Sequence, residues 1–191
     1  MIQVFDTAAA SIALARRMLP CPQDCGQMLR PWGHARERTV RDTSGALLRV
    51  RPDRALCRGC DVTHVVLDAR LLPRHGYAAG LIGRAVLGAA LGSGHRSIAG
   101  ELAVPPGTVR GWIRGARRWA IQLRVKGIRT LVHHGQDMPT RWPPGELGFA
   151  LECLGAAAMA LARRYQLHHV SPWAVINVVT GGRLLSMAPF G

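Results

Sequence analysis

Four cysteines stand in two tight pairs, and their spacing gives the clearest indication of chemistry in the chain. Cys21 and Cys25 are separated by three residues, whereas Cys57 and Cys60 are separated by two. The intervening residues 26–56 have the strand and turn pattern of a β-hairpin, so each pair can form one knuckle of a zinc ribbon. Four thiolates complete the tetrahedral coordination of Zn²⁺ and leave no position for water or substrate. We therefore predict one structural Zn²⁺ bound by Cys21, Cys25, Cys57 and Cys60.

The same thiols could instead form disulfides or pack as separate buried side chains. The chain has five cysteines, an odd number, and Cys153 stands alone in an alanine-rich segment. An odd count suits a reducing compartment better than a set of disulfides. A histidine near the knuckles, His34 or His64, could also replace one of the four cysteines as a metal ligand.

A second pattern, in residues 96–114, is typical of a helix-turn-helix. Two short helices that cross closely need apolar residues at the crossing, a small residue at the closest approach and a turn between them. Ala99 is the small residue, Ala103 stands at the turn position where glycine is usual, and Pro106 suits the first turn of the second helix. The apolar core positions are Ile98, Leu102, Val104, Val109 and Trp112.

The second helix of this pair, predicted over residues 107–118, would be a recognition helix in the DNA major groove. Arg110 and Arg114 are four residues apart and could pair with guanine edges or phosphates, while Gly111 would let the backbone approach closely. The other arginines are expected to hold phosphates, although a helical hairpin with a solvated arginine face remains the alternative. The predicted DNA-contacting residues are Arg96, Thr108, Arg110, Gly111, Arg114, Arg117 and Arg118.

Arginines also follow the predicted ribbon strands and could form a second phosphate-contacting surface. An ordinary exposed sheet face explains them equally well. These residues are Arg36, Arg38, Arg41, Arg49, Arg51 and Arg54.

Length and composition fit one medium domain or two small ones, because the chain has 191 residues, 48% of them hydrophobic. There are 25 Lys and Arg against 11 Asp and Glu, a formal net charge of +14, which would attract phosphate polymers. The most apolar run, 147–162, is shorter than a bilayer requires and contains Glu152, so we expect a buried or dimer-forming helix and no membrane role. No signal peptide is convincing, and the predicted location is cytoplasmic and nucleoid-associated.

The predicted fold class is α+β, mostly α, with a small zinc-ribbon β module followed by a helix-turn-helix and C-terminal helices. The hydrophobic period changes from two to about 3.6 after Gly76, which separates the two kinds of structure. The predicted units are an N-terminal helix (1–19), the zinc ribbon (20–75), the helix-turn-helix domain (76–126), a linker (127–145) and a C-terminal helical segment (146–191).

Within these units the sequence predicts short strands and helices. Strands at 37–41 and 46–51 flank the turn residues 42–45, a third strand covers 63–67, and residues 51–54 turn the chain toward the second knuckle. The expected helices cover 77–91, 96–103, 108–125, 146–165 and 172–179.

The chain resembles an uncharacterised family of small proteins from high-GC bacteria that join a zinc ribbon to a helix-turn-helix and a short helical segment. The resemblance implies zinc at the four cysteines and DNA at the helix-turn-helix. The order of the parts also resembles the DNA-binding front end of insertion-sequence transposases and their short accessory proteins. The matching stretches are 21–26 (CPQDCG), 49–67 (RVRPDRALCRGCDVTHVVL), 94–99 (GHRSIA), 108–114 (TVRGWIR) and 180–185 (TGGRLL).

These features predict a sequence-specific DNA-binding protein, either a transcriptional regulator or an end-binding accessory subunit of a mobile element with a separate transposase. The alternative is a protein adaptor that docks a polymerase or recombinase partner through its ribbon and apolar C-terminal helices. A homodimer could form through the same helices. We do not expect an enzyme, because the acidic residues are scattered and no glycine-rich phosphate loop or nucleophile elbow is present.

Overall fold

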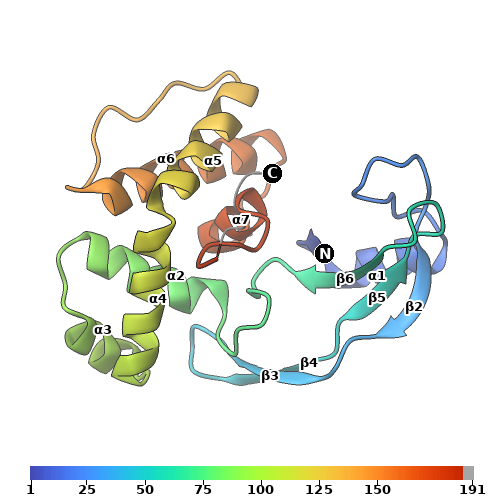
Figure 1. The fold of residues 1–191 in the computed structure, drawn as a ribbon, viewed down its shortest axis with the longest axis horizontal. Helices are drawn as coiled ribbons and strands as arrows, with labels where there is room; N and C mark the ends of the chain where they lie inside the picture. The colour runs from blue at the N-terminus through green and yellow to red at the C-terminus, as the bar shows by residue number, and fades with distance from the viewer. Residues whose placement is uncertain (187–191) are drawn as a thin grey trace.

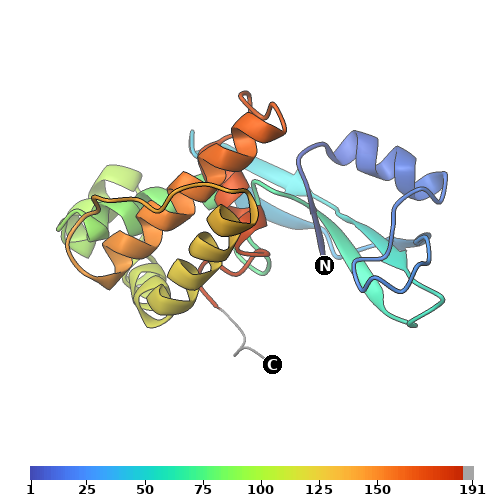
Figure 2. The ribbon, with the colours of Figure 1, turned by 90° about the horizontal axis from the view of Figure 1, so that it is seen from above.

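The computed structural model describes residues 1–186 and has an α+β fold, mostly helical, as predicted. Strands and one helix form an N-terminal β module, and the remaining helices form a second part beside it (Figures 1 and 2). A long two-stranded hairpin runs from the β module toward the helical part (Figure 1). The two kinds of structure are therefore packed side by side rather than interleaved.

The β module contains a four-stranded sheet in the order β1-β6-β5-β2. Strand β1 runs parallel to β6, while β5 pairs antiparallel with both β6 and β2. The sheet brings the start of the chain next to a strand more than 60 residues later, with Ile2 opposite Val66. The strands are β1 (Ile2–Val4), β2 (Arg30–His34), β5 (Asp53–Leu56) and β6 (Thr63–Asp68).

Helix α1 (Thr7–Ala15) covers the sheet with the buried side chains of Ala10 and Leu14. The Asp6 carboxylate caps it by accepting a hydrogen bond from the backbone N–H of Ala9 at 2.9 Å. The cap agrees with the sequence, but the prediction that residues 1–19 form only a helix is wrong. The first residues form β1 instead, because the neighbouring strand β6 supplies their hydrogen-bonding partners.

Strands β3 (Arg38–Arg41) and β4 (Leu47–Val50) form the predicted hairpin. The Asp42 carboxylate accepts hydrogen bonds from the backbone N–H groups of Ser44 at 2.8 Å and Ala46 at 2.9 Å, which fixes the turn. Strands β2 and β5 were not predicted. Residues 51–54 were expected to be a turn, whereas Asp53–Leu56 pairs on both sides.

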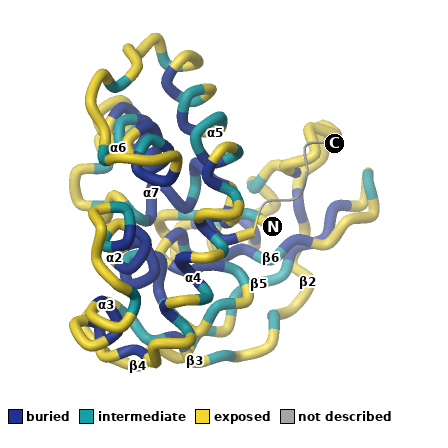
Figure 3. Tube along the Cα trace, turned by 60° about the vertical axis from the view of Figure 1, so that its left-hand side comes forward, coloured by how far each residue is buried: buried dark blue, intermediate teal, exposed yellow. Residues whose placement is uncertain are grey.

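The helical part is built on one large apolar core, to which all six of its helices and the residues after the last helix contribute. Buried residues follow the inner faces of these helices, and residues on the outer faces are exposed (Figure 3). The helices are α2 (Ala79–Ala90), α3 (His95–Leu102), α4 (Pro106–Arg118), α5 (Ala120–His133), α6 (Glu146–Arg164) and α7 (Pro172–Val179).

The helix predicted over 108–125 is two helices, because the chain bends at Trp119 between α4 and α5. Trp119 has φ −109° and ψ 14°, outside the range of a regular α-helix. Helix α5 then continues to His133, so residues 127–133 are helical and not part of a linker. The irregular connection to α6 begins only after His134.

The apolar run of α6 is buried within the molecule between α5 and α7. Helices α5 and α6 approach closely at Gly127, where an added Cβ would lie 2.8 Å from the backbone carbon of Cys153. Self-packing therefore accounts for most of the apolar surface of α6. Among the described residues, no helix is long and apolar enough to cross a membrane.

Helix α7 ties the helical part to the β module through a buried polar side chain. The Asn177 side-chain amide donates hydrogen bonds to the backbone carbonyls of Ala69 at 2.7 Å and Leu71 at 3.0 Å. These carbonyls belong to the chain that leaves β6, so the last helix holds the segment between sheet and helices. The ring of Trp173 also packs directly on Gly83 of α2.

Candidate metal centre and the α3–α4 helices

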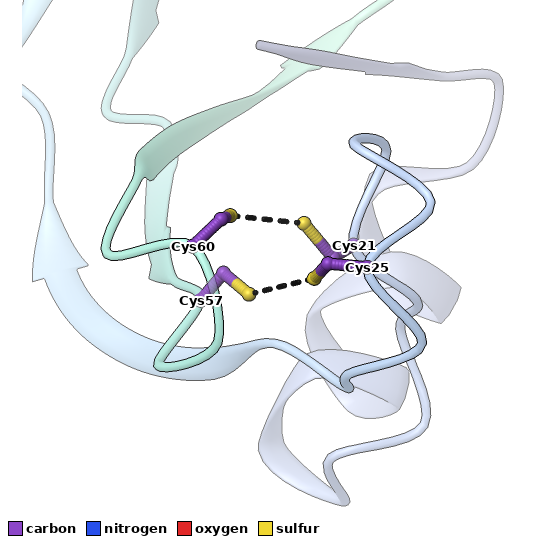
Figure 4. Close-up of side chains that lie close together, drawn as sticks. All are labelled: Cys21, Cys25, Cys57 and Cys60. Carbon is purple, nitrogen blue, oxygen red and sulfur yellow. Dashed lines mark hydrogen bonds between the residues drawn. The ribbon is translucent and has the colours of Figure 1, made fainter.

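Each cysteine pair lies on a tight hairpin of the β module. In the first, the Cys21 N–H donates to the carbonyl of Gln27 at 2.9 Å. In the second, which connects β5 to β6, the Cys57 N–H donates to the carbonyl of Val62 at 3.0 Å. The two hairpin ends face each other, so pairs separated by more than 30 residues of sequence meet at one place (Figure 4).

Left-handed backbone follows the second cysteine of each pair. Gly26 has φ +72° and Asp61 has φ +53°, conformations that turn the chain sharply after Cys25 and Cys60. The knuckles also pack on one another. A Cβ added at Gly59 would lie 2.6 Å from the Gln27 Cγ atom, so this position leaves no room for a side chain.

The four cysteine sulfurs surround one point. The Sγ atoms of Cys21 and Cys60 are 3.7 Å apart, those of Cys25 and Cys57 are 3.4 Å apart, and all four lie within 4.8 Å of one another (Figure 4). A disulfide would require about 2.05 Å, so these sulfurs are not bonded in pairs. Four sulfurs each about 2.3 Å from a tetrahedral ion would be about 3.8 Å apart. The cluster could therefore hold a metal ion such as zinc.

The environments of the four thiols differ. Cys21 and Cys57 are buried, Cys60 is half-buried and Cys25 is exposed. The backbone N–H of Cys60 donates to the Cys57 sulfur and lowers the Cys57 pKa to about 6. Burial raises the pKa of Cys21 to about 12 and also raises the pKa of Cys60. Because metal ions bind thiolates, a bound dication would offset the cost of ionising the buried thiols.

The alternative ligands lie outside the cluster. His34 Nδ1 is 3.0 Å from the Asp53 carboxylate on the neighbouring strand. His64 is buried, and its Nδ1 is 3.2 Å from the amino group of Met1. Cys153 is buried in the helical part beside α5. Within residues 1–186, the group of metal-binding side chains consists of the two cysteine pairs.

Helices α3 and α4 bring the predicted apolar positions of residues 96–114 into one core. Ala103 ends α3 in the left-handed conformation, with φ 49° and ψ 47°. Non-glycine residues adopt this conformation infrequently, and here it turns the chain so that Pro105 precedes α4. The buried residues contributed by the pair are Ile98, Ala99, Leu102, Val104, Val109, Trp112, Ile113 and Ala116.

The charged residues of this segment lie away from the core. Four arginines recur along α4 at the spacing of one helix face, and Arg96 is exposed on α3. Thr108 and Gly111 are half-buried beside them, and a Cβ added at Gly111 would have no neighbour within 4 Å. The exposed arginines of α4 are Arg110, Arg114, Arg117 and Arg118.

Some ribbon arginines have partners within the molecule. Arg38 donates to the carbonyl of Leu72 at 3.3 Å, and Arg49 pairs with Glu37 at 2.6 Å. These contacts support the interpretation of the strands as an ordinary sheet face more than a continuous phosphate-binding surface. Arg36 and Arg51 are exposed.

The predicted DNA-contacting residues include none of the basic side chains of α5, although Lys126, Arg129 and His133 are exposed on one side of this helix. A signal for them was present in the sequence. No acidic residue occurs between Glu101 and Asp137, the segment that contains α4 and α5.

A model of a protein family described as a domain of unknown function (DUF6431) matches residues 21–110. The matched region begins at the first cysteine of the cluster and ends in the first turns of α4. It therefore includes both knuckles, strands β2 to β6 and helices α2 and α3. No curated protein and no solved structure matches the chain.

Proposed function

We propose that this protein binds DNA sequence-specifically through α3 and α4, and that its cysteine cluster holds one structural Zn²⁺. The carrying observation is the division of α4 into two faces. Val109, Trp112 and Ile113 are buried in the core, while four arginines are exposed on the other side. A helix that only completed a core would not need such a uniform outer charge.

The packing of α3 against α4 supports a helix-turn-helix. Ile98 and Ala99 on α3 meet the core that contains Val109 and Trp112 of α4. The connection is short, because α3 ends at Leu102 and α4 begins at Pro106. Consecutive helices joined by a three- or four-residue turn can place the second helix in the major groove.

Arg110 and Arg114 are the proposed base-contacting residues. They lie about one turn apart on α4, with Arg110 in its first half and Arg114 just past its middle, and the N-terminal part of a recognition helix is the part that reaches base edges. Guanidinium groups can donate two parallel hydrogen bonds to guanine O6 and N7. Gly111 lies between them and leaves space for a close approach of the DNA, whereas Arg117 and Arg118 would contact phosphates.

The cysteine cluster is suited to a structural role. Four thiolates from Cys21, Cys25, Cys57 and Cys60 would complete the tetrahedral coordination of Zn²⁺, which would supply folding energy to the β module. The apolar core around the cluster is small, with Ala10, Leu14 and few other side chains. Small sheets with so little buried apolar area usually need further stabilisation, and zinc would provide it. We propose no catalytic activity.

A competition gel-shift assay tests the proposal. Zinc-loaded protein would be mixed with labelled duplexes from its own locus and an excess of bulk DNA, over a series of salt concentrations. We expect at least one fragment to remain bound at physiological salt. Binding that is equal for all sequences and disappears steeply with salt would contradict sequence-specific recognition, because charge alone would explain it.

Regulation of transcription and end-binding for a mobile element both require this activity, and a footprint would separate them by its position. An adaptor role is favoured less, because the apolar residues of α6 are mostly buried against α5 and α7. The homodimer predicted from the same helix is likewise a proposal, and a two-fold symmetric footprint would support it.

A further inference from the structure

The segment from α4 to the end of α5 carries half of the net charge of the chain. Residues 102–136 contain seven Lys and Arg and no Asp or Glu, which is +7 of the total +14. A solvated helix surface usually mixes the two signs, as α6 does with Glu152 and Arg163. The absence of acidic residues over two consecutive helices indicates a positively charged surface that would attract a polyanion.

Only part of this charge is used inside the molecule. Arg124 pairs with Glu146 at 2.8 Å, and its guanidinium lies 5.4 Å from the centre of the Phe149 ring. It therefore fixes α5 to α6. Lys126 and His133 are exposed and lie seven residues apart, which places them on one face of α5.

Two hollows lie beside basic residues of α4 and α5. One is lined by Arg114 and Arg118 of α4 together with Leu185. The other is lined by Lys126 and His133 of α5 together with the α7 residue Val179. The chain between Val179 and Leu185 is a compact turn with successive backbone hydrogen bonds, so both hollows border the same short segment of the chain.

Arg183 is exposed on that turn, and its charge also acts on the amino group of Met1. We call the surface formed by Arg118, Lys126, His133 and Arg183 the basic face.

We infer that the basic face binds the phosphate backbone of the DNA beside the major groove occupied by α4. This inference rests on the proposed function and deepens it. The N-terminal part of a recognition helix reaches the bases, and the C-terminal end leaves the groove near a phosphate strand. Helix α5 begins at Ala120, directly after that end, so Lys126 and Arg183 meet the backbone beyond the contacts of α4.

The test is the salt dependence of binding by a Lys126→Gln, Arg183→Gln double variant. Each phosphate contact contributes about 0.9 to the slope of log Kobs against log salt. We expect the variant to lose about 2 units of slope and to weaken binding equally for the preferred and the random duplex. Its preference for the target sequence should remain, because phosphate contacts carry no base information.

A matched control removes two exposed arginines elsewhere, in an Arg16→Gln, Arg164→Gln double variant. It has the same change in net charge and should keep the wild-type slope. Equal slopes for all three proteins would overturn the basic face while leaving sequence-specific binding intact. If the wild-type protein binds DNA without sequence preference, the proposed function is wrong. A reduced slope in the Lys126→Gln, Arg183→Gln variant would still support phosphate binding by the basic face. Wild-type protein that binds no duplex would overturn both.

Discussion

The Arg41 guanidinium on β3 donates a hydrogen bond to the carbonyl of Ala103, with 2.5 Å between Nη1 and the oxygen. Ala103 is the left-handed residue that turns the chain from α3 to α4. The backbone of Arg41 is also held, because its N–H donates to Gly76 and its carbonyl accepts from Ala78, both at 2.9 Å. The hairpin of the β module thus touches the turn that sets the direction of α4.

Replacement of Arg41 by alanine should therefore weaken DNA binding without direct loss of a DNA contact. The hydrogen bond to Ala103 is exposed, so we expect a loss of about 1 kcal/mol in the free energy of unfolding. Binding to the target duplex should fall several-fold because α4 is held less firmly. The control is Arg49→Ala, which removes an exposed partner of Glu37. Equal affinities for the two variants in anisotropy titrations would argue against this coupling.

Removal of the metal should unfold the β module. Addition of a strong chelator to the zinc-loaded protein is expected to lower the melting temperature, since structural zinc contributes on the order of 10 kcal/mol in small zinc domains. Cys57→Ser should reproduce this effect and reduce the zinc content measured by mass spectrometry under native conditions. Cys153→Ala removes a thiol from the helical core instead, and should keep one zinc per chain. A Cys57→Ser protein with full zinc content and unchanged melting would show that the cluster is not the metal site.

A substitution at Gly111 should have opposite effects on the stability of α4 and on DNA affinity. A Cβ at this position meets no atom within 4 Å, so Gly111→Ala should stabilise α4 by about 1 kcal/mol through helix propensity. The same methyl group would stand where the DNA approaches, so affinity for the target should decrease. Gly155→Ala in α6 is the matched control, because its Cβ also meets nothing within 4 Å and it should leave binding unchanged. Thermal melts and binding curves of both variants would test this; a Gly111→Ala protein that binds as tightly as Gly155→Ala would contradict the close approach.

Much of the architecture follows from local patterns in the sequence. The turn at Asp42 and Gly45 predicted the β3–β4 hairpin, and the apolar periodicity predicted α7 with the bounds Pro172–Val179. The predicted α6 differs from the observed helix by one residue at its end. These elements are determined by residues that are close together in the chain, so the sequence alone predicts them.

The missed elements depend on distant partners. Strand β1 is three residues long and exists because β6 lies beside it, and the sequence of β2 lacks the alternation typical of a half-buried strand because every residue is exposed. The bend at Trp119 has no glycine or proline to indicate it. Gly127 reads as a helix breaker, yet it lies within α5 and permits the close crossing with α6 at Cys153.

The candidate sites also differ in whether they depend on local sequence or on contacts between distant residues. Pair spacing was sufficient to select the four cysteines that the structure brings together, because knuckles are local. The contact between Arg41 and Ala103 and the side chain of Asn177 against the chain after β6 could not be predicted. Both join residues more than 60 positions apart, and only the packed fold shows that they meet.

The most direct test of the central claim measures sequence preference in an Arg110→Ala, Arg114→Ala double variant. The ratio of its affinities for the target duplex and a random duplex would be compared with those of wild type and of Arg16→Ala, Arg164→Ala. A lost bidentate base contact costs about 1–3 kcal/mol, so two should reduce the ratio by roughly 30-fold or more. The control should keep the wild-type ratio. An unchanged ratio in the Arg110→Ala, Arg114→Ala protein would mean that α4 does not read the DNA sequence.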